Sequence, residues 1–143
     1  MIIDENVKQN IAKVQSEHDF RKETGGILIG LYDPQREALR ITDMSFAYPS
    51  DNCGRLHFSR KSTGHQEFAD DLWVKSGYKK AYLGEWHTHN QASPVPSVID
   101  RNTWKRISMQ NNNFDQCFFL IVGREHFAIW GVIKEEVNVV EEC

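Results

Sequence analysis

Two histidines, a serine and an aspartate lie close together in the middle of the chain, at a spacing that suits metal binding. The stretch contains His87, His89, a loop with two prolines, Ser97 and then Asp100. On a strand, residues two apart project to the same side, so the two imidazoles point together. Two neutral imidazoles and one carboxylate leave a fourth tetrahedral position for water, as in catalytic zinc sites. We therefore predict that His87, His89 and Asp100 bind one zinc ion per chain.

Zinc-assisted hydrolysis also needs a base and a group that stabilises negative charge. The base takes a proton from the attacking water and hands it to the leaving group. Glu23 is the best candidate, because it stands just before the apolar segment 25–31, where a charge is unexpected. Ser97 is the candidate donor to the developing oxyanion. Ser97 and Asp100 also match a helix capping box, and capping and metal binding are compatible roles for the pair.

The remaining candidate side chains carry weaker signals. No spacing supports His57 or His65 as ligands, and we expect them at the surface or next to the ligands. Cys53 and Cys117 have no accompanying histidine or asparagine motif, so we expect small buried residues rather than nucleophiles. The tryptophans are expected in the core; those considered are Trp86, Trp104 and Trp130.

The elements that must position these residues follow from periodicity and turn signals. Helices are predicted over residues 4–20, 62–76 and 97–110. Strands are predicted over residues 23–32, 39–48, 55–60, 80–89, 117–122 and 126–134. The acidic segment 135–142 is expected to be an exposed tail or an edge strand. Helices mixed with hairpin-linked strands indicate an α/β or α+β sandwich.

The composition is that of a single-domain protein that binds neither nucleic acid nor membranes. We predict one domain over residues 1–143, which is long enough to bury a core. The net charge of -3 gives no electrostatic reason to bind nucleic acid. No apolar run reaches membrane-spanning length, and the start of the chain lacks the pattern of a signal peptide. The three cysteines are widely spaced, which favours free thiols in a cytoplasmic protein.

The same residues resemble the JAMM motif of the JAB/MPN zinc metalloproteases, and the resemblance extends over residues 20–133. The matching residues are Glu23-Thr24-Gly25-Gly26 and His87-x-His89-x7-Ser97-x2-Asp100. The resemblance implies a cytidine-deaminase-like α/β/α sandwich with a mixed sheet. It also implies the roles for the site residues: ligands His87, His89 and Asp100, general base Glu23 and oxyanion donor Ser97. One departure is Asn90, because family members commonly carry proline directly after the second histidine.

Within that family the chain resembles the prokaryotic branch found beside bacterial E1- and E2-like genes, including the anti-phage CBASS operons. This implies a cytoplasmic isopeptidase that acts on the C-terminal tail of a ubiquitin-like protein or of a conjugated nucleotidyltransferase. E1- and E2-like proteins are then expected partners by operon association. An extended tail needs a strand edge or a flap to bind against, and the segment Asn52 to Ser59 is the candidate for it.

Other functions within and beyond this family remain open at this point. A peptidase that matures a ubiquitin-like precursor, or acts on a sulfur-carrier adduct, would use the same zinc chemistry. A DNA-repair-associated JAB protein usually shows His-x-His-Pro-Ser-Gly, whereas this chain continues with Asn90-Gln91-Ala92. Non-catalytic MPN scaffolds typically lose ligands, and every ligand is present here. Zinc deaminases need a Pro-Cys-x-x-Cys element, and Cys117 stands alone.

Overall fold

A mixed sheet forms the centre of the protein, in a computed structural model that describes residues 1–143. In spatial order its seven strands are β1 (Ile2–Ile3), β3 (Ala38–Met44), β2 (Gly25–Asp33), β6 (Ala81–Thr88), β7 (Cys117–Val122), β8 (Phe127–Ile133) and β9 (Glu136–Glu142). The central pair β6 and β7 is parallel, as is β1 with β3 at one edge. The other neighbours are antiparallel.

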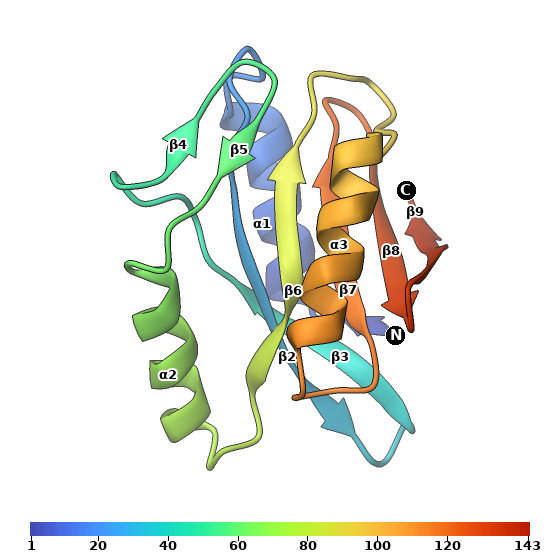
Figure 1. The fold of residues 1–143 in the computed structure, drawn as a ribbon. Coiled ribbons are helices and arrows are strands. Elements are labelled where there is room, and N and C mark those ends of the chain that lie inside the picture. Colours follow the sequence, from blue (N-terminus) through green and yellow to red (C-terminus); the bar gives the residue numbers. More distant parts are fainter.

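Helices cover both faces of the sheet. They are α1 (Glu5–Glu17), α2 (His65–Lys75) and α3 (Val98–Gln110). In Figure 1, α1 lies behind the sheet, whereas α2 and α3 lie in front of it on either side of β6. This arrangement confirms the predicted α/β/α sandwich with a mixed sheet. None of the helices is long and apolar enough to cross a membrane.

Each face of the sheet has its own apolar core. On the α1 face, Val7 and Ile11 pack into a cluster of 13 buried residues that includes Trp86. On the α3 face, Trp104 and Trp130 belong to a second cluster of 7 buried residues. All three tryptophans predicted in the core are buried, which confirms that prediction.

The structure shifts the ends of several predicted elements. The first helix ends at Glu17 rather than near residue 20, because His18 already has an extended backbone. The strand predicted to residue 48 ends at Met44. The short strand predicted over residues 55–60 is β5 (Phe58–Ser59), and it pairs with β4 (Asn52–Cys53), which lies outside the predicted strands. We call residues 52–59 the β4–β5 ribbon. The acidic C-terminal segment forms the exposed edge strand β9.

Candidate metal centre

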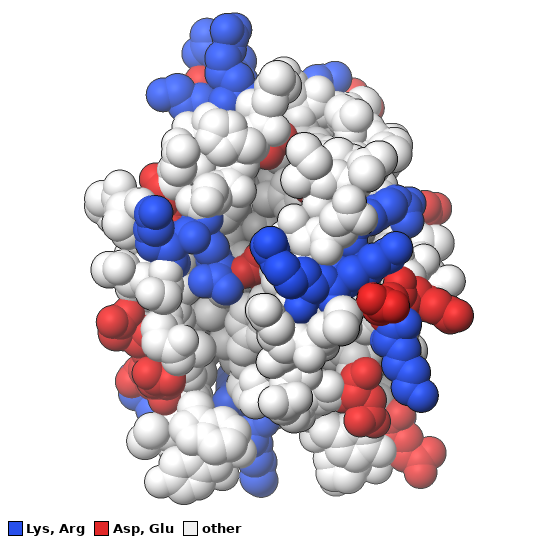
Figure 2. All heavy atoms as spheres, viewed as in Figure 1, with Lys and Arg blue, Asp and Glu red and all other residues white.

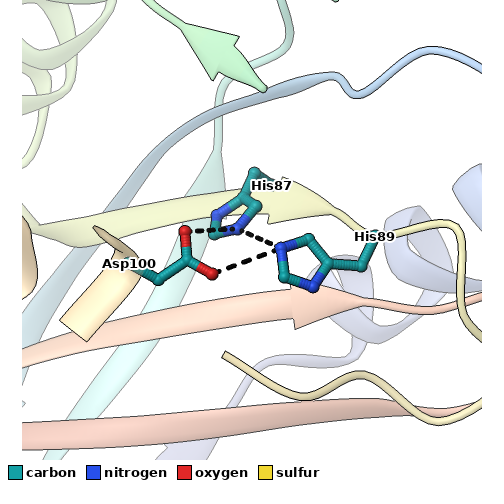
Figure 3. A group of neighbouring side chains, drawn as sticks. All are labelled: His87, His89 and Asp100. Carbon is teal, nitrogen blue, oxygen red and sulfur yellow. Dashed lines mark hydrogen bonds and ion pairs between the residues drawn. The ribbon is translucent and has the colours of Figure 1, made fainter. Parts of the chain in front are cut away.

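The end of β6 and the first turn of α3 bring the three predicted ligands together (Figure 3). The Nε2 atoms of His87 and His89 lie 3.1 Å apart. Asp100 Oδ1 lies 3.3 Å from His87 Nε2, and Asp100 Oδ2 lies 3.2 Å from His89 Nε2. Each side chain is half-buried and offers one ligand atom to a common centre.

The spacing of these atoms fits a tetrahedral metal ion. Zinc binds imidazole nitrogen and carboxylate oxygen at about 2.0–2.2 Å, and tetrahedral angles then separate neighbouring ligand atoms by roughly 3.3–3.5 Å. The two imidazole nitrogens are 3.1 Å apart here, and each lies 3.2–3.3 Å from a different carboxylate oxygen of Asp100. Two imidazoles and one carboxylate match the ligand set of catalytic zinc sites, in which water takes the fourth position. The residues present therefore fit a zinc ion.

A capping box at the start of α3 orients Asp100. Ser97 occupies the N-cap, and its Oγ accepts a hydrogen bond from the Asp100 N–H at 3.0 Å. In return the Ser97 N–H donates to Asp100 Oδ2 at 2.8 Å. The predicted capping box is therefore present. Because Oδ2 also faces His89, one carboxylate both caps the helix and joins the ligand cluster.

The loop of residues 90–96, which joins β6 to α3, is tied to the turn between β7 and β8. The Arg124 N–H donates to the Gln91 carbonyl at 2.7 Å. A Cβ atom at Gly123 would lie 2.7 Å from Gln91 O and 2.8 Å from Ala92 O, so only glycine permits this approach. The loop therefore has a fixed course between the two ligand-bearing elements.

Two loop side chains support the cluster, and the sequence did not reveal either role. Gln91 Oε1 lies 3.3 Å from His89 Nδ1 and accepts the Val95 N–H at 3.0 Å. Such outer partners orient metal-binding imidazoles. Asn90, which stands where family members commonly have proline, accepts a hydrogen bond from Arg124 Nη1 at 2.6 Å. A side-chain contact thus restrains the loop at the position where proline is missing.

The pairing of β2 with β6 places Glu23 next to the ligands. Gly25 lies opposite His87 in this antiparallel pair, so the chain just before β2 brings Glu23 opposite His89. The Glu23 side chain is buried and lines the same cavity as the ligands. Its backbone N–H donates to the Gly54 carbonyl of the β4–β5 ribbon at 2.6 Å. Strand pairing therefore brings together residues that lie far apart in the sequence.

The charged groups of the cluster influence one another strongly. Burial raises the pKa of the Glu23 carboxyl above its usual value, although His87 and His89 partly oppose that rise. Burial alone would raise the pKa of Asp100, but its hydrogen bonds with His87 and His89 outweigh burial and lower it. Burial would lower the pKa of His89, and Asp100 more than compensates, so that pKa is raised. Asp100 is thus a carboxylate at neutral pH, as a metal ligand must be.

The cluster lies in a cavity of about 430 Å³, which is also lined by Ser97. The β4–β5 ribbon forms one wall, α3 forms the other, and β6 forms the floor. The exposed His57 lines this cavity but lies outside the ligand cluster. All five predicted site residues therefore surround one space.

His65 is in neither of the places predicted for it. It is buried away from the ligands, where its Nδ1 lies 2.7 Å from Ser45 Oγ and its Nε2 lies 2.6 Å from Asp51 Oδ2. Asp51 also accepts the N–H groups of Tyr48 at 2.8 Å and Lys61 at 2.7 Å. We call Ser45, His65 and Asp51 the buried relay. No spacing in the sequence predicts the buried relay, because its three residues come from separate segments.

Comparison with known proteins finds relatives over most of the chain. The family model of prokaryotic homologs of the JAB domain matches residues 5–135. A CD-NTase/cGAS isopeptidase of Escherichia coli (strain TW11681) is 31% identical over 142 residues, covering 99% of this chain and 88% of that protein. A CD-NTase/cGAS isopeptidase of Vibrio cholerae serotype O1 is 30% identical over 125 residues, covering 87% of this chain and 77% of that protein.

Solved structures share the fold. A solution structure of a Desulfitobacterium hafniense protein superposes with a TM-score of 0.66 at 20% identity, over 99% of this chain and 90% of that one. A crystal structure of a JAB1/MPN domain protein from Archaeoglobus fulgidus gives a TM-score of 0.50 at 18% identity, over 99% of this chain and 94% of that one. The family match and the similarity to both isopeptidases lead to one conclusion: the chain belongs to the prokaryotic JAB-domain family.

Proposed function

We propose that this protein is a zinc-dependent isopeptidase that removes a conjugated protein from its target. The bond it hydrolyses is the amide between the C-terminus of a ubiquitin-like or ubiquitin-mimicking protein and an amine of the target. The conjugated protein is the nucleotidyltransferase of a CBASS operon, and E1- and E2-like proteins of the same operon are the partners that attach it. The names of the E. coli and V. cholerae relatives support this choice of substrate.

The proposal rests on one observation. The Nε2 atoms of His87 and His89 lie 3.1 Å apart, each within 3.3 Å of a carboxylate oxygen of Asp100, and Glu23 lies buried in the same cavity. A ligand set with a carboxylate next to it, but outside it, is the arrangement that metal-assisted hydrolysis of an amide requires. A scaffold protein would have no need to bury Glu23 at this position.

Each site residue then has a specific task. His87, His89 and Asp100 would hold zinc, which when bound would supply Lewis acidity and lower the pKa of a bound water to about 7. The Glu23 carboxylate accepts the proton of the attacking water and returns it to the amine that leaves. The Ser97 oxygen accepts the Asp100 N–H, which leaves the hydroxyl proton free to stabilise the oxyanion.

The test combines metal analysis with a change at Glu23. Glu23→Gln keeps the size of the side chain and removes its ability to accept a proton. We expect about one zinc per chain in both proteins, and loss of conjugate cleavage by at least a hundredfold in the variant. Plasma emission spectrometry measures the zinc, and gel analysis of a nucleotidyltransferase–target conjugate measures the cleavage.

The matched control is Glu17→Gln, the same substitution at an exposed position of α1. It should retain both zinc and activity. Absence of zinc from the wild-type protein, or full activity of Glu23→Gln, would overturn the proposal. A precursor-processing peptidase would instead cleave a linear peptide extension and leave the lysine-linked conjugate intact.

A further inference from the structure

A second cavity lies next to the one at the ligands, on the same side of the strand β6. The second cavity has a volume of about 360 Å³ and shares one lining residue, Arg60, with the first. Four of its ten lining residues carry carboxamides: Gln66, Gln110, Asn111 and Asn113. In Figure 2 a hollowed strip runs down this face, between the side that carries the β4–β5 ribbon and α2 and the side that carries α3. The two cavities therefore form one groove with two chambers.

An ion pair stands where the chambers meet. Arg60, just after the ribbon, donates from Nε to a carboxylate oxygen of Glu85 on β6. The Arg60 guanidinium carbon also lies 5.9 Å from the ring centre of Tyr82. Glu85 lines only the chamber at the ligands and Tyr82 only the second chamber, whereas Arg60 lines both. The Arg60–Glu85 pair is thus the boundary between the chambers.

The spacing of residues along β6 gives the length of the groove. Tyr82, Glu85 and His87 contribute to its floor, with Glu85 two residues before a zinc ligand. At about 3.3 Å per residue, the boundary lies roughly 7 Å from His87, and the floor from Tyr82 to His87 is roughly 16 Å long. That length accommodates four or five residues of an extended peptide.

The chemistry of an isopeptide bond indicates which part of the substrate fills this length. On the target side the bond leads to a lysine side chain, which presents only four methylene groups. On the other side it leads to a continuous peptide tail. A groove several residues long therefore suits the tail. Carboxamide groups can donate hydrogen bonds to peptide carbonyls and accept them from peptide N–H groups. The second chamber can therefore bind the backbone of a tail without selecting among its side chains.

Building on the proposed isopeptidase function, we propose that the Arg60–Glu85 pair is a size-selecting boundary within the groove that binds the substrate tail. The tail lies along β6 with its C-terminal carbonyl at the ligand cluster. The residue that crosses the boundary is the second or third from the C-terminus, and it must have a small side chain. The residues before it occupy the carboxamide-lined chamber.

The test uses quenched fluorescent isopeptides as probes. Each carries an eight-residue tail, taken from the C-terminus of the conjugated nucleotidyltransferase, on the lysine of a short peptide. One tail position at a time is changed to Ala or to Phe. For the wild-type protein we expect kcat/KM to fall at least tenfold from Ala to Phe at the second or third position, and less than threefold at the fourth to eighth.

Substitutions at the boundary should change this selectivity alone. Arg60→Ala should reduce the tenfold discrimination to less than threefold, because it joins the two chambers. Arg60→Met keeps much of the side-chain length and should retain the discrimination. The control Lys61→Ala removes an equal charge at the neighbouring exposed residue and should behave like wild type. If Arg60→Ala does not fold, Arg60→Val, which is shorter than both arginine and methionine, should show partial loss.

The outcomes separate this inference from the proposed function. The boundary proposal would be wrong if the wild type and Arg60→Ala discriminated equally between Ala and Phe tails. It would also be wrong if Lys61→Ala lost this discrimination. Either result would leave the isopeptidase proposal intact. A zinc-loaded wild-type protein that cleaves none of the probes and no intact conjugate would overturn both. Zinc content and melting temperature of each variant show whether the ligand cluster and the fold survive the substitution.

Discussion

Replacing Asp51 with asparagine should lower the melting temperature of the protein by about 7 °C. The Asp51 and His65 side chains of the buried relay are almost fully inaccessible, at 0% and 1% exposure. The carboxylate accepts three hydrogen bonds, from the N–H groups of Tyr48 and Lys61 and from the His65 ring. Asparagine has only one acceptor oxygen, so its amide group must face at least one of these donors.

The size of the effect follows from the cost of an unmade hydrogen bond. Leaving a buried donor unsatisfied costs about 1–3 kcal/mol, and we take about 2 kcal/mol for Asp51→Asn. An unfolding entropy of roughly 2.1 cal/mol/K per residue amounts to roughly 0.3 kcal/mol/K for a chain of 143 residues. A loss of about 2 kcal/mol therefore lowers the melting temperature by about 7 °C.

The effect should depend on pH in a defined direction. Burial alone would raise the pKa of Asp51, but the hydrogen bonds it accepts outweigh burial and lower it. A lowered folded-state pKa adds stability above the pKa of the unfolded chain, about 3.9 for aspartate, and this stability is lost as the pH falls through the folded-state pKa. The difference between wild type and Asp51→Asn should thus be constant from pH 7 to pH 5 and shrink below about pH 4.

Thermal unfolding followed by circular dichroism provides the measurement. The control is Asp71→Asn, which removes an exposed ion pair with Lys75 on α2. Such surface pairs contribute about 0.5 kcal/mol or less, so the control should melt within about 2 °C of wild type. The reasoning fails if Asp51→Asn melts as close to wild type as the control does, or if its deficit does not shrink in acid.

Two further predictions concern the ligand loop and the helix that carries Asp100. Gly123→Ala should weaken zinc binding about tenfold, because the added Cβ displaces the loop that holds Gln91 against His89; competition with a coloured zinc chelator measures this, and unchanged affinity would contradict it. Trp104→Ala should lower the free energy of unfolding in urea by about 3–5 kcal/mol, because it empties the centre of the core under α3. The exposed Trp73 serves as its control, since Trp73→Ala should cost less than about 1 kcal/mol.

Elements with a strong local pattern could be predicted from the sequence, and those that depend on distant partners could not. The strand Cys117–Val122 was predicted to the residue, because its apolar run ends at clear turn signals. The strands Ile2–Ile3 and Asn52–Cys53 were missed, since two residues carry no periodicity and each exists only through its pairing. Asp4 occupies the N-cap of α1, but its carboxylate pairs with the distant Arg40 rather than with the helix N–H groups, which no local pattern indicates.

The sequence by itself determined the ligand cluster. Strand alternation aligns His87 with His89, and a capping box turns Asp100 back toward the loop, so short-range geometry assembles three ligand atoms. Only the tertiary structure decided what surrounds them. The position of Glu23 depends on the register between β2 and β6, and the Arg60–Glu85 boundary depends on where the β4–β5 ribbon meets the sheet. These contacts join segments that lie far apart in the sequence. No local sequence pattern predicts that such segments meet, because the packing of the whole chain decides which of them lie side by side.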